Sequence, residues 1–246
     1  MKPKITALAL TFNEEENVKR YVESLSFADE IVFIDSFSSD KTVEIARECG
    51  VTVFQREFDT LANQKDFAIS KASNDWITFF DLDEVVTPEL KKEILEKAGN
   101  GDIQIAYSVK RKFFFFGKQI KYGEWHSDDT VKLFNKRTDF LNNGFITNGR
   151  IKKLKNAVDY YGYQSFDSYN AKLNRLSSLE ATALYSKNKR PNFYHFFILP
   201  NLYFLKKYIV KLGLLEGKEG FILCYLHSFA IFKRYLNLWL MYRKIE

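Results

Sequence analysis

The sequence D-W-I-T-F-F-D-L-D-E spans residues 75–84 of this 246-residue chain. Its apolar run from Trp76 to Phe80 predicts a buried β-strand. Two carboxylates, Asp81 and Asp83, follow that strand, and both can point to one side because side chains alternate along extended backbone. Carboxylate oxygens bind hard divalent cations, and α/β proteins bind ligands at the carboxyl edge of their sheets. The stretch therefore predicts a metal site at a strand end, although a D-x-D pair alone is not specific.

The residues before this stretch alternate between strand and helix patterns. Predicted strands cover residues 5–10, 31–34 and 51–54, and predicted helices cover residues 17–24, 42–49 and 61–72. Such alternation with short connections predicts βαβ units and a parallel sheet, and right-handed crossovers place the carboxyl ends of the strands on one edge. We therefore expect one crevice to collect the polar residues at these ends, which are Asn13, Glu14, Asp35, Asp81 and Asp83.

The pattern changes after the acid pair. Thr87-Pro88-Glu89 predicts a helix start that carries a Thr cap and Pro at the first position, and this helix should stop at Gly99. Residues 105–112 alternate like a half-buried strand, and F-F-F-F-G at residues 113–117 predicts an aromatic hairpin or lid. We favour the interpretation that these aromatic side chains are packed in the protein. The alternative is that they form a platform on which an acceptor substrate binds.

The C-terminal segment, residues 193–242, has an aromatic, basic and helical pattern that breaks near Pro200 and residues 213–220. No stretch in it reaches the roughly 20 apolar residues that a transmembrane helix needs. Residues 191–246 contain eight basic and three acidic residues, so this segment holds most of the chain's net charge of +6. Basic residues interleaved with apolar ones favour helices that lie on an anionic membrane, and a packed helical pair or an oligomer contact is the alternative.

The composition narrows the class of protein. A hydrophobic content of 46% is enough for a large buried core, so a folded chain is expected. The two cysteines, Cys49 and Cys224, lie far apart and belong to no C-x-x-C pair, which favours a reducing compartment. The apolar run at residues 5–10 is too short for a signal peptide, so we expect a cytoplasmic protein. Nucleic-acid binding is not expected because the basic residues alternate with apolar ones.

Four motifs together resemble glycosyltransferase family 2, and closely its bacterial branch that builds the lipopolysaccharide or lipooligosaccharide core. These motifs are T-F-N-E-E-E-N at residues 11–17, A-D-E-I-V-F-I-D-S-F-S-S-D-K-T-V-E-I-A at 28–46, N-Q-K-D-F-A-I at 63–69, and D-W-I-T-F-F-D-L-D-E at 75–84. A looser resemblance continues through G-E-W-H-S-D-D-T-V-K-L-F at 123–134, Y-N-A-K-L-N-R-L-S at 169–177 and the basic tail. The resemblance therefore covers nearly the whole chain.

The resemblance implies an α/β fold with a central, mostly parallel sheet and flanking helices, of the GT-A-like kind found in nucleotide-diphospho-sugar transferases. A helical, aromatic and basic C-terminal region would follow it. We accordingly expect a nucleotide-sugar-binding and catalytic domain over residues 1–155 and a helical, membrane-associating extension over residues 156–246. The implied reaction is the inverting transfer of a sugar from a nucleotide-diphosphate sugar to a lipid-linked or oligosaccharide acceptor, at the cytoplasmic face of the inner membrane.

The resemblance also implies roles for single residues. Asp35 would accept a hydrogen bond from the nucleobase, and Asn13 and Glu14 would line the same pocket. Lys65 would approach the diphosphate. Asp81 would face the ribose and the metal, and Asp83 would ligate Mg2+ or Mn2+, whose charge stabilises a departing diphosphate. Other interpretations remain open, since Asp35 can be a loop acid, Lys65 a solvated helix residue and Glu84 a residue that holds the loop.

Inversion needs a general base within hydrogen-bond reach of the acceptor hydroxyl. The related branch has a His-Glu pair after its tryptophan loop, whereas Asn142 and Asn143 stand at the matching positions here. Because asparagine cannot serve as this base, Asp128 is the preferred candidate over Asp129 and Glu124. The alternative is a nucleotide-sugar-binding or scaffold protein that has lost turnover.

A second class of enzyme shares the D-x-D signature. In phosphatases of the haloacid dehalogenase type, Asp81 would be the nucleophile and Asp83 the acid or base. That motif normally ends the first strand of its domain, whereas three strand-helix units precede it here. The position therefore makes this class a remote alternative.

Overall fold

The structure is a computed structural model, and it describes residues 3–123, 125, 129–138, 141–142, 145–146, 150–162 and 166–244. The chain folds as two compact units. The first comprises residues 1–112 and 127–161 and is called the α/β unit below. The second comprises residues 113–126 and 162–246 and is called the helical unit.

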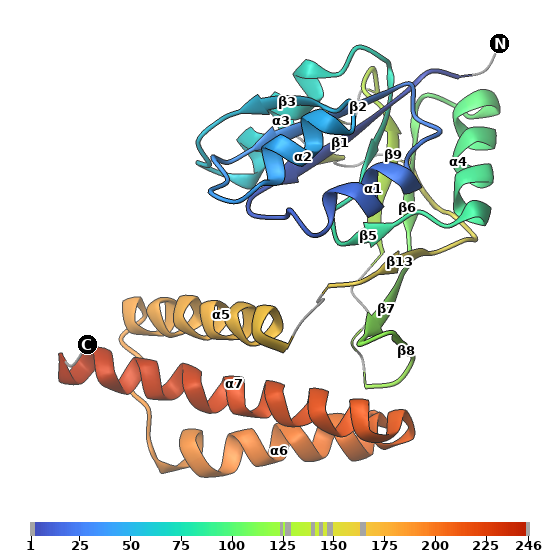
Figure 1. Cartoon of the computed structure of the whole chain (residues 1–246). Helices are drawn as coiled ribbons and strands as arrows, with labels where there is room; N and C mark the ends of the chain where they lie inside the picture. The colour runs from blue at the N-terminus through green and yellow to red at the C-terminus, as the bar shows by residue number, and fades with distance from the viewer. Residues whose placement is uncertain are drawn as a thin grey trace. The chain divides into compact units, whose positions relative to one another are not determined.

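A seven-stranded sheet forms the centre of the α/β unit, in the order β12-β6-β9-β4-β1-β2-β3 (Figure 1). Its strands are β1 (Ile5–Thr11), β2 (Glu30–Asp35), β3 (Thr52–Gln55), β4 (Trp76–Phe79), β6 (Ile105–Val109), β9 (Thr130–Asn135) and β12 (Arg150–Lys153). Strands β4, β1, β2 and β3 run parallel, and β12 is parallel to β6. Strand β9 is antiparallel to both of its neighbours. The expected central, mostly parallel sheet is confirmed.

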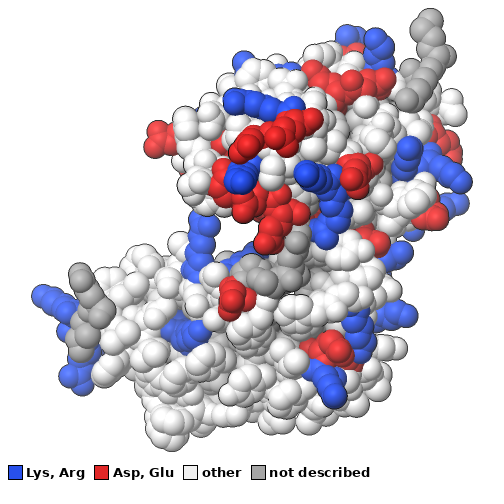
Figure 2. All heavy atoms as spheres, in the orientation of Figure 1, with Lys and Arg blue, Asp and Glu red and all other residues white. Residues whose placement is uncertain are grey.

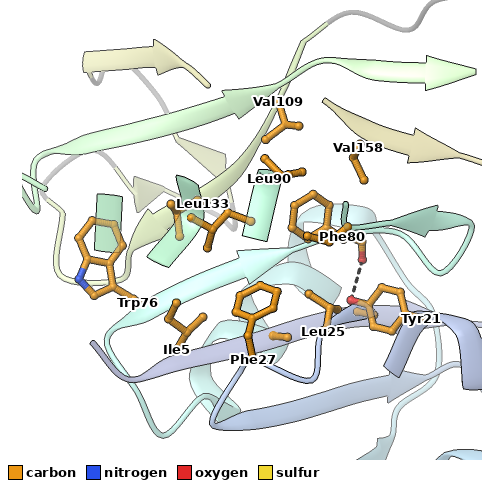
Figure 3. Packing of buried hydrophobic residues seen from close by; sticks show 14 of the residues in the cluster. Ile5, Tyr21, Leu25, Phe27, Trp76, Phe80, Leu90, Val109, Leu133 and Val158 are labelled. Atoms are coloured by element: carbon orange, nitrogen blue, oxygen red, sulfur yellow. Dashed lines mark hydrogen bonds between the residues drawn. The ribbon is translucent and has the colours of Figure 1, made fainter. Parts of the chain in front are cut away.

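Four helices flank this sheet, namely α1 (Val18–Ser24), α2 (Thr42–Glu48), α3 (Leu61–Lys71) and α4 (Pro88–Asn100). Helices α1, α2 and α4 contribute to one buried cluster, part of which Figure 3 shows around Tyr21, Phe80 and Leu90. Helix α3 contributes Ala68 and Ile69 to a second cluster. The two clusters explain why β4 is buried throughout and why β1 is buried except at Leu10, since a parallel sheet is covered on both faces.

Local chemistry sets the ends of these helices. Thr87 caps α4 by accepting a hydrogen bond from the Leu90 N–H at 3.2 Å, and Pro88 occupies the first turn, as predicted. The helix continues past Gly99 to Asn100, so the predicted stop at Gly99 is wrong. Helix α2 has Lys41 at its cap position, and the Lys41 side chain makes no capping hydrogen bond. Asp40 instead accepts hydrogen bonds from the N–H and the hydroxyl of Thr42.

Short strands complete the α/β unit. Strand β5 (Glu84–Val85) pairs antiparallel with β13 (Val158–Tyr160), and β10 (Leu141–Asn142) pairs with β11 (Phe145–Ile146). The single strand predicted over residues 105–112 is divided, because β6 ends at Val109 and β7 (Arg111–Phe115) begins two residues later. The chain passes from the α/β unit into the helical unit within β7.

The helical unit contains two long helices, α5 (Phe166–Ser186) and α7 (Gly217–Arg243). They are joined by hydrogen bonds, including Ser177 Oγ to the Ala230 carbonyl at 2.9 Å. Short helical segments lie between them in the sequence: η1 (Tyr194–Ile198), α6 (Leu199–Leu205), η2 (Lys206–Val210) and η3 (Gly213–Glu216). The predicted helical pattern agrees with this arrangement, and so does a break before α7, which begins at Gly217. The break predicted near Pro200 is wrong, because helical backbone continues from η1 through α6 and Pro200 lies in the first turn of α6. No helix in the described part of the chain is both long and apolar enough to cross a membrane.

The aromatic hairpin belongs to the helical unit. Strand β7 pairs antiparallel with β8 (Lys118–Ile120). Phe113 and Phe115 are buried, and the Phe115 ring packs against Tyr169 of α5 with centroids 5.4 Å apart. Packed aromatics, the favoured interpretation, therefore describe these two residues, whereas Phe116 at the turn is exposed.

Candidate active site

The carboxyl ends of β4, β1 and β2 meet at one edge of the sheet. Thr11 and Asp35 are register partners at the ends of β1 and β2, and Asp35 is in turn the partner of Gln55 in β3. Asp81 follows β4, the other neighbour of β1. The predicted strand-end residues therefore lie along this edge, as parallel pairing requires.

Asp35 is fully buried and is held by four hydrogen bonds. Its Oδ1 accepts from the hydroxyls of Thr11 at 3.1 Å and Ser38 at 2.5 Å, and its Oδ2 accepts from the Ser38 N–H at 2.9 Å and Gln55 Nε2 at 3.2 Å. These bonds tie the loop after β2 to β1 and β3. Asp35 therefore holds this loop in place, and its role toward a nucleobase stays a prediction.

Asn13 and Glu14 hold the loop after β1 against the loop after β2. Asn13 has a positive φ of 55°, and its side-chain oxygen accepts from the Ser39 N–H at 2.8 Å while its own N–H donates to Ser38 Oγ at 2.9 Å. The Glu14 N–H donates to Thr42 Oγ1 at 2.7 Å. Asn13 and Asp35 both contact Ser38, so the structure brings these two predicted site residues together.

Asp81 and Glu84 form a closed turn after β4. The Asp81 N–H donates to Glu84 Oε2 at 2.8 Å, and the Glu84 N–H donates to the Asp81 carbonyl at 2.9 Å. Glu84 is fully buried, so its carboxylate supports the turn from below the surface. The interpretation of Glu84 as a residue that holds the loop agrees with these contacts.

Two cations connect the carboxylates of this turn. Lys132 Nζ lies 2.7 Å from Glu84 Oε2 and 3.1 Å from Asp81 Oδ2. Arg111 pairs with Glu84 Oε1 and with Asp81 Oδ2. We call Asp81, Glu84, Arg111 and Lys132 the charge cluster. Buried charges such as those of Glu84 and Lys132 require such pairing, because each would otherwise lose its hydration without compensation.

The charge cluster changes the ionisation of its neighbours. Burial opposes ionisation of Asp81, but Lys132, Arg111 and Lys65 outweigh this effect, so the pKa of Asp81 lies below its usual value. Lys65, on α3, has a lowered pKa because of burial and Lys132, while Asp81 acts in the opposite direction. Its Nζ lies 5.5 Å from the centre of the Phe79 ring. Lys65 is therefore half-buried near the cluster and is not a solvated helix residue.

Asp83 follows two residues after Asp81 and is half-buried. Its carbonyl accepts from the Tyr161 N–H at 2.8 Å. Asp81 and Asp83 are carboxylates, which is the ligand type that Mg2+ and Mn2+ prefer, and such ions commonly take only one or two carboxylates beside water and phosphate oxygens. Among the described residues no group of three or more acidic, histidine or cysteine side chains forms a complete metal cage. The two aspartates fit a cation whose remaining ligands are water and substrate.

A buried tyrosine supports the start of the turn. The Tyr21 hydroxyl lies 3.2 Å from the carbonyl oxygens of Leu8 and of Phe80, the residue before Asp81 (Figure 3). Burial, together with Asp81 and Glu84, raises the pKa of Tyr21 well above its ordinary value, so the hydroxyl stays protonated and can donate. Helix α1 thus helps to position the end of β4.

The structure adds Lys132 and Arg111 to the site, and the sequence interpretation omitted both. A lone lysine between apolar residues in T-V-K-L-F, residues 130–134, is the signal that predicts a buried cation in strand β9. Arg111 has no comparable signal. The proposed base Asp128 lies outside the described residues, as do Glu124 and Asn143, and only the backbone of Asn142 is described, in β10.

The fold and this edge define an α/β domain of the kind that binds nucleotides at the carboxyl ends of its strands. The sequence model described as "Glycosyl transferase family 2" matches residues 7–175, which is more than half of the chain. The chain belongs to this family and is a glycosyltransferase. The resemblance drawn from the motifs is thereby confirmed, and the haloacid dehalogenase alternative is not retained.

Relatives match over most of their length. An uncharacterized glycosyltransferase of Rickettsia bellii is 29% identical over an alignment 263 residues long. The alignment covers 96% of this chain and 86% of the relative. The lipopolysaccharide core biosynthesis glycosyltransferase LpsC of Rhizobium meliloti is 24% identical over 256 residues, with 96% and 95% coverage. The second relative belongs to the type of pathway that the resemblance implied.

Solved structures show a weaker likeness. TarS 1–349 of S. aureus aligns with 98% of this chain and 91% of its own chain, at 14% identity and a TM-score of 0.44. Glucosyl-3-phosphoglycerate synthase from Mycobacterium tuberculosis, in complex with Mn2+, uridine diphosphate and glucosyl-3-phosphoglycerate, aligns with 46% of this chain and 44% of its own, at 22% identity and a TM-score of 0.38. The family assignment rests on the sequence match.

Proposed function

We propose that this glycosyltransferase moves a sugar, with inversion, from a nucleotide-diphosphate sugar to a lipopolysaccharide, lipooligosaccharide or other cell-surface glycan acceptor. Binding of the nucleotide-sugar donor is supported by one observation, the D-x-D turn at the carboxyl edge of the sheet. Glu84 closes this turn, and Arg111 and Lys132 hold it in place. The printed name of the LpsC relative supports the acceptor class.

The residues divide into two groups within this proposal. The first group lines the nucleotide pocket and consists of Asp35, Asn13 and Glu14. If the hydrogen bonds from Ser38 to Asp35 opened, the Asp35 carboxylate could accept a hydrogen bond from the nucleobase. Asp81, Asp83 and Lys65 lie at the diphosphate. Both groups lie within residues 1–155, the proposed catalytic domain, and residues 156–246 are the proposed helical extension. The compact units differ from this division, because residues 113–126 belong to the helical unit and residues 156–161 to the α/β unit.

A divalent cation, Mg2+ or Mn2+, belongs to the donor group of this proposal. Asp83 and Asp81 would hold it, and the bound cation would supply positive charge against the charge that develops on the departing diphosphate. Lys65 adds a further positive charge near the same place. These groups act more strongly at a partly buried site than in water, because the effective dielectric constant is lower there.

Asp128 is the proposed general base for the acceptor hydroxyl. A carboxylate can take this proton, whereas the amides of Asn142 and Asn143 cannot. The competing possibility is a protein that binds the nucleotide sugar without transferring it. Turnover, measured separately from binding, distinguishes the two.

The test combines the chain with a panel of UDP-, GDP-, ADP- and dTDP-sugars and with Mn2+, and it measures binding by calorimetry and release of free nucleoside diphosphate. We expect metal-dependent binding of one donor, with Asp83→Asn weakening it by about tenfold or more through loss of a carboxylate ligand. Asp75→Asn, at the start of β4, is the matched control and should bind like the native chain. Absence of metal-dependent donor binding would sink the proposal, and binding without turnover for every acceptor would favour the binding-protein alternative.

We further propose that the helical unit lies on an anionic membrane surface at the cytoplasmic face of the inner membrane. Large apolar side chains are exposed on its helices, and Phe193 and Val210 each expose 69% of their surface. We call the following set the apolar surface: Phe193, Phe197, Leu205, Ile209, Val210, Leu215, Phe221 and Tyr225. Soluble domains rarely expose so many large apolar side chains without a partner.

Ring contacts join this apolar surface to neighbouring aromatic side chains. The Phe221 ring of α7 lies 5.6 Å from Phe204, 5.8 Å from Tyr208 and 6.2 Å from Tyr225. Figure 2 shows that the visible face of the helical unit is mostly uncharged, with Lys and Arg atoms near its ends. Exposed aromatics together with lysines such as Lys206 and Lys211 suit an anionic lipid surface.

Vesicle flotation tests this second proposal. The chain should float with vesicles that contain phosphatidylglycerol, and less so at about 1 M salt, where the Debye length is about 3 Å. Ile209→Glu and Val210→Glu should reduce flotation, whereas Leu179→Glu, at an exposed position on α5 outside the apolar surface, should not. Failure of the native chain to float would contradict the proposal. A change in native mass by the first two variants without vesicles would assign the surface to a second copy instead.

A further inference from the structure

The charge cluster is layered by exposure to solvent. The side chain of Glu84 exposes 0% of its surface, Lys132 exposes 5% and Arg111 exposes 15%, whereas Asp81 exposes 56%. The two cations therefore lie between a carboxylate that no ligand can reach and one that faces the candidate site. A ligand cannot contact Glu84 directly. The Glu84 carboxylate acts on a ligand through the two cations that it holds and through the hydrogen bond that it accepts from the Asp81 N–H.

Both cations contact the same oxygen of Asp81. Arg111 Nη2 and Lys132 Nζ each pair with Oδ2. A carboxylate that already neutralises two cations attracts a further cation less strongly than an isolated one.

The formal charges of the cluster cancel, since two carboxylates face two cations. This balance is sensitive to single changes. Loss of the Glu84 charge leaves an excess of one positive charge beside Asp81, and loss of the Lys132 or Arg111 charge leaves an excess of one negative charge. At separations of a few ångströms, one unit charge changes the binding of a divalent ion by about tenfold or more, even at an effective dielectric constant of about 20.

We propose that Glu84, Lys132 and Arg111 are positioning residues that set how the site divides its affinity between a divalent cation and the anionic diphosphate. This inference rests on the proposed function, because it concerns the metal and donor of that same site. Glu84 holds the two cations so that they neutralise Asp81 only in part. The site can then accept the metal through Asp81 and Asp83 while it keeps positive charge for the diphosphate.

The inference predicts effects of opposite sign, which a purely structural role would not produce. Glu84→Gln should weaken binding of Mn2+ by about tenfold and strengthen binding of a nucleoside diphosphate without metal. Lys132→Met, which retains an apolar stem of similar length, should strengthen binding of Mn2+ and weaken metal-free binding of the nucleoside diphosphate. A variant that merely loosens the turn would weaken both ligands.

Two measurements provide these values without turnover. The electron paramagnetic resonance signal of free Mn2+ reports metal binding by the chain alone, and calorimetry in the presence of a chelator reports binding of the nucleoside diphosphate preferred by the native chain. Glu96→Gln and Lys97→Gln, a paired acid and base on α4, are the matched controls and should change neither value. Thermal unfolding of every variant shows whether it is folded.

Further variants keep the test decisive if one of these does not fold. Arg111→Gln removes a cation at a less buried position and should act in the same direction as Lys132→Met. The double variant Glu84→Gln with Lys132→Met restores the charge balance, so its Mn2+ affinity should return toward the native value.

The outcomes separate the two levels of proposal. If the native chain binds neither Mn2+ nor a nucleoside diphosphate, both the proposed function and this inference fail. If the native chain binds both and the Glu84 and cation variants shift Mn2+ affinity in the same direction, the proposed function stands and the inference is overturned. Opposite shifts, with compensation in the double variant, support the inference.

Discussion

Asp81 and Glu84 hold each other through reciprocal hydrogen bonds: the Asp81 N–H donates to the Glu84 carboxylate at 2.8 Å, and the Glu84 N–H donates to the Asp81 carbonyl at 2.9 Å. This relationship joins a buried residue to an exposed one across a single turn. It explains how the end of β4 can present carboxylates to solvent while the backbone that carries them stays rigid.

Tyr21→Phe should destabilise the α/β unit. The variant removes the hydroxyl that lies 3.2 Å from the Leu8 and Phe80 carbonyls, and it leaves buried acceptors without this donor. We expect the free energy of unfolding to fall by about 1–2 kcal/mol, measured by urea denaturation. Tyr225→Phe changes an exposed tyrosine and serves as the control. Equal stability of Tyr21→Phe and the native chain would show that the hydroxyl does not support β4.

The pH dependence of stability should change in Glu93→Gln. Burial opposes ionisation of Glu93, but the N–H groups of Lys155 and Asn156 and the Asn156 amide outweigh it, so its pKa lies below 4.5. A carboxyl group whose pKa is depressed in the folded state stabilises the fold at pH values above its unfolded-state pKa. This contribution to the free energy of unfolding is lost as the pH falls through the folded-state pKa. The stability difference between the native chain and the variant should therefore be largest near neutral pH and shrink in acid. Denaturation midpoints on either side of that pKa measure it, and a constant difference at all pH values would refute the prediction.

Glu216 should anchor the aromatic hairpin within the helical unit. Its buried Oε1 accepts from the N–H groups of Lys121 at 2.6 Å and Tyr122 at 2.7 Å. Glu216→Ala leaves both donors unsatisfied and should cost about 2 kcal/mol or more. Glu216→Gln keeps one acceptor and should cost less. Thermal unfolding ranks the two, with Glu57→Ala, at an exposed position of the α/β unit, as control. The reverse order would contradict this assignment.

Asp128→Asn tests the proposed base. The variant should lower kcat by about a hundredfold or more, because the amide cannot accept the acceptor proton, and it should leave nucleoside diphosphate binding unchanged. Asp129→Asn is the control, since Asp129 pairs with Lys153. Turnover measured after saturation with donor isolates the chemical step. Full activity of Asp128→Asn would move the base to another residue, and loss of activity in the control would indicate Asp129.

Local patterns in the sequence were sufficient for the α/β half of the fold. Strand and helix alternation predicted β1 to β4 and the parallel order, because each pattern depends on residues a few positions apart. The acids after β4 were found for the same reason, since they follow an apolar run directly. The end of α4 at Gly99 was predicted wrongly, because the final turn of a helix depends on packing as well as on capping propensity.

The sequence by itself determined the family, the parallel sheet and the position of the D-x-D pair, because these follow from short-range patterns and motif order. Only the tertiary structure decided which cations hold that pair. Arg111 and Lys132 lie 27 and 51 residues from their carboxylate partners and reach them because β7 and β9 lead back to the end of β4. Burial then makes their pairing obligatory, since a buried carboxylate such as Glu84 needs a partner. Pairing between residues so far apart in the sequence is determined by packing, and no local sequence pattern predicts it.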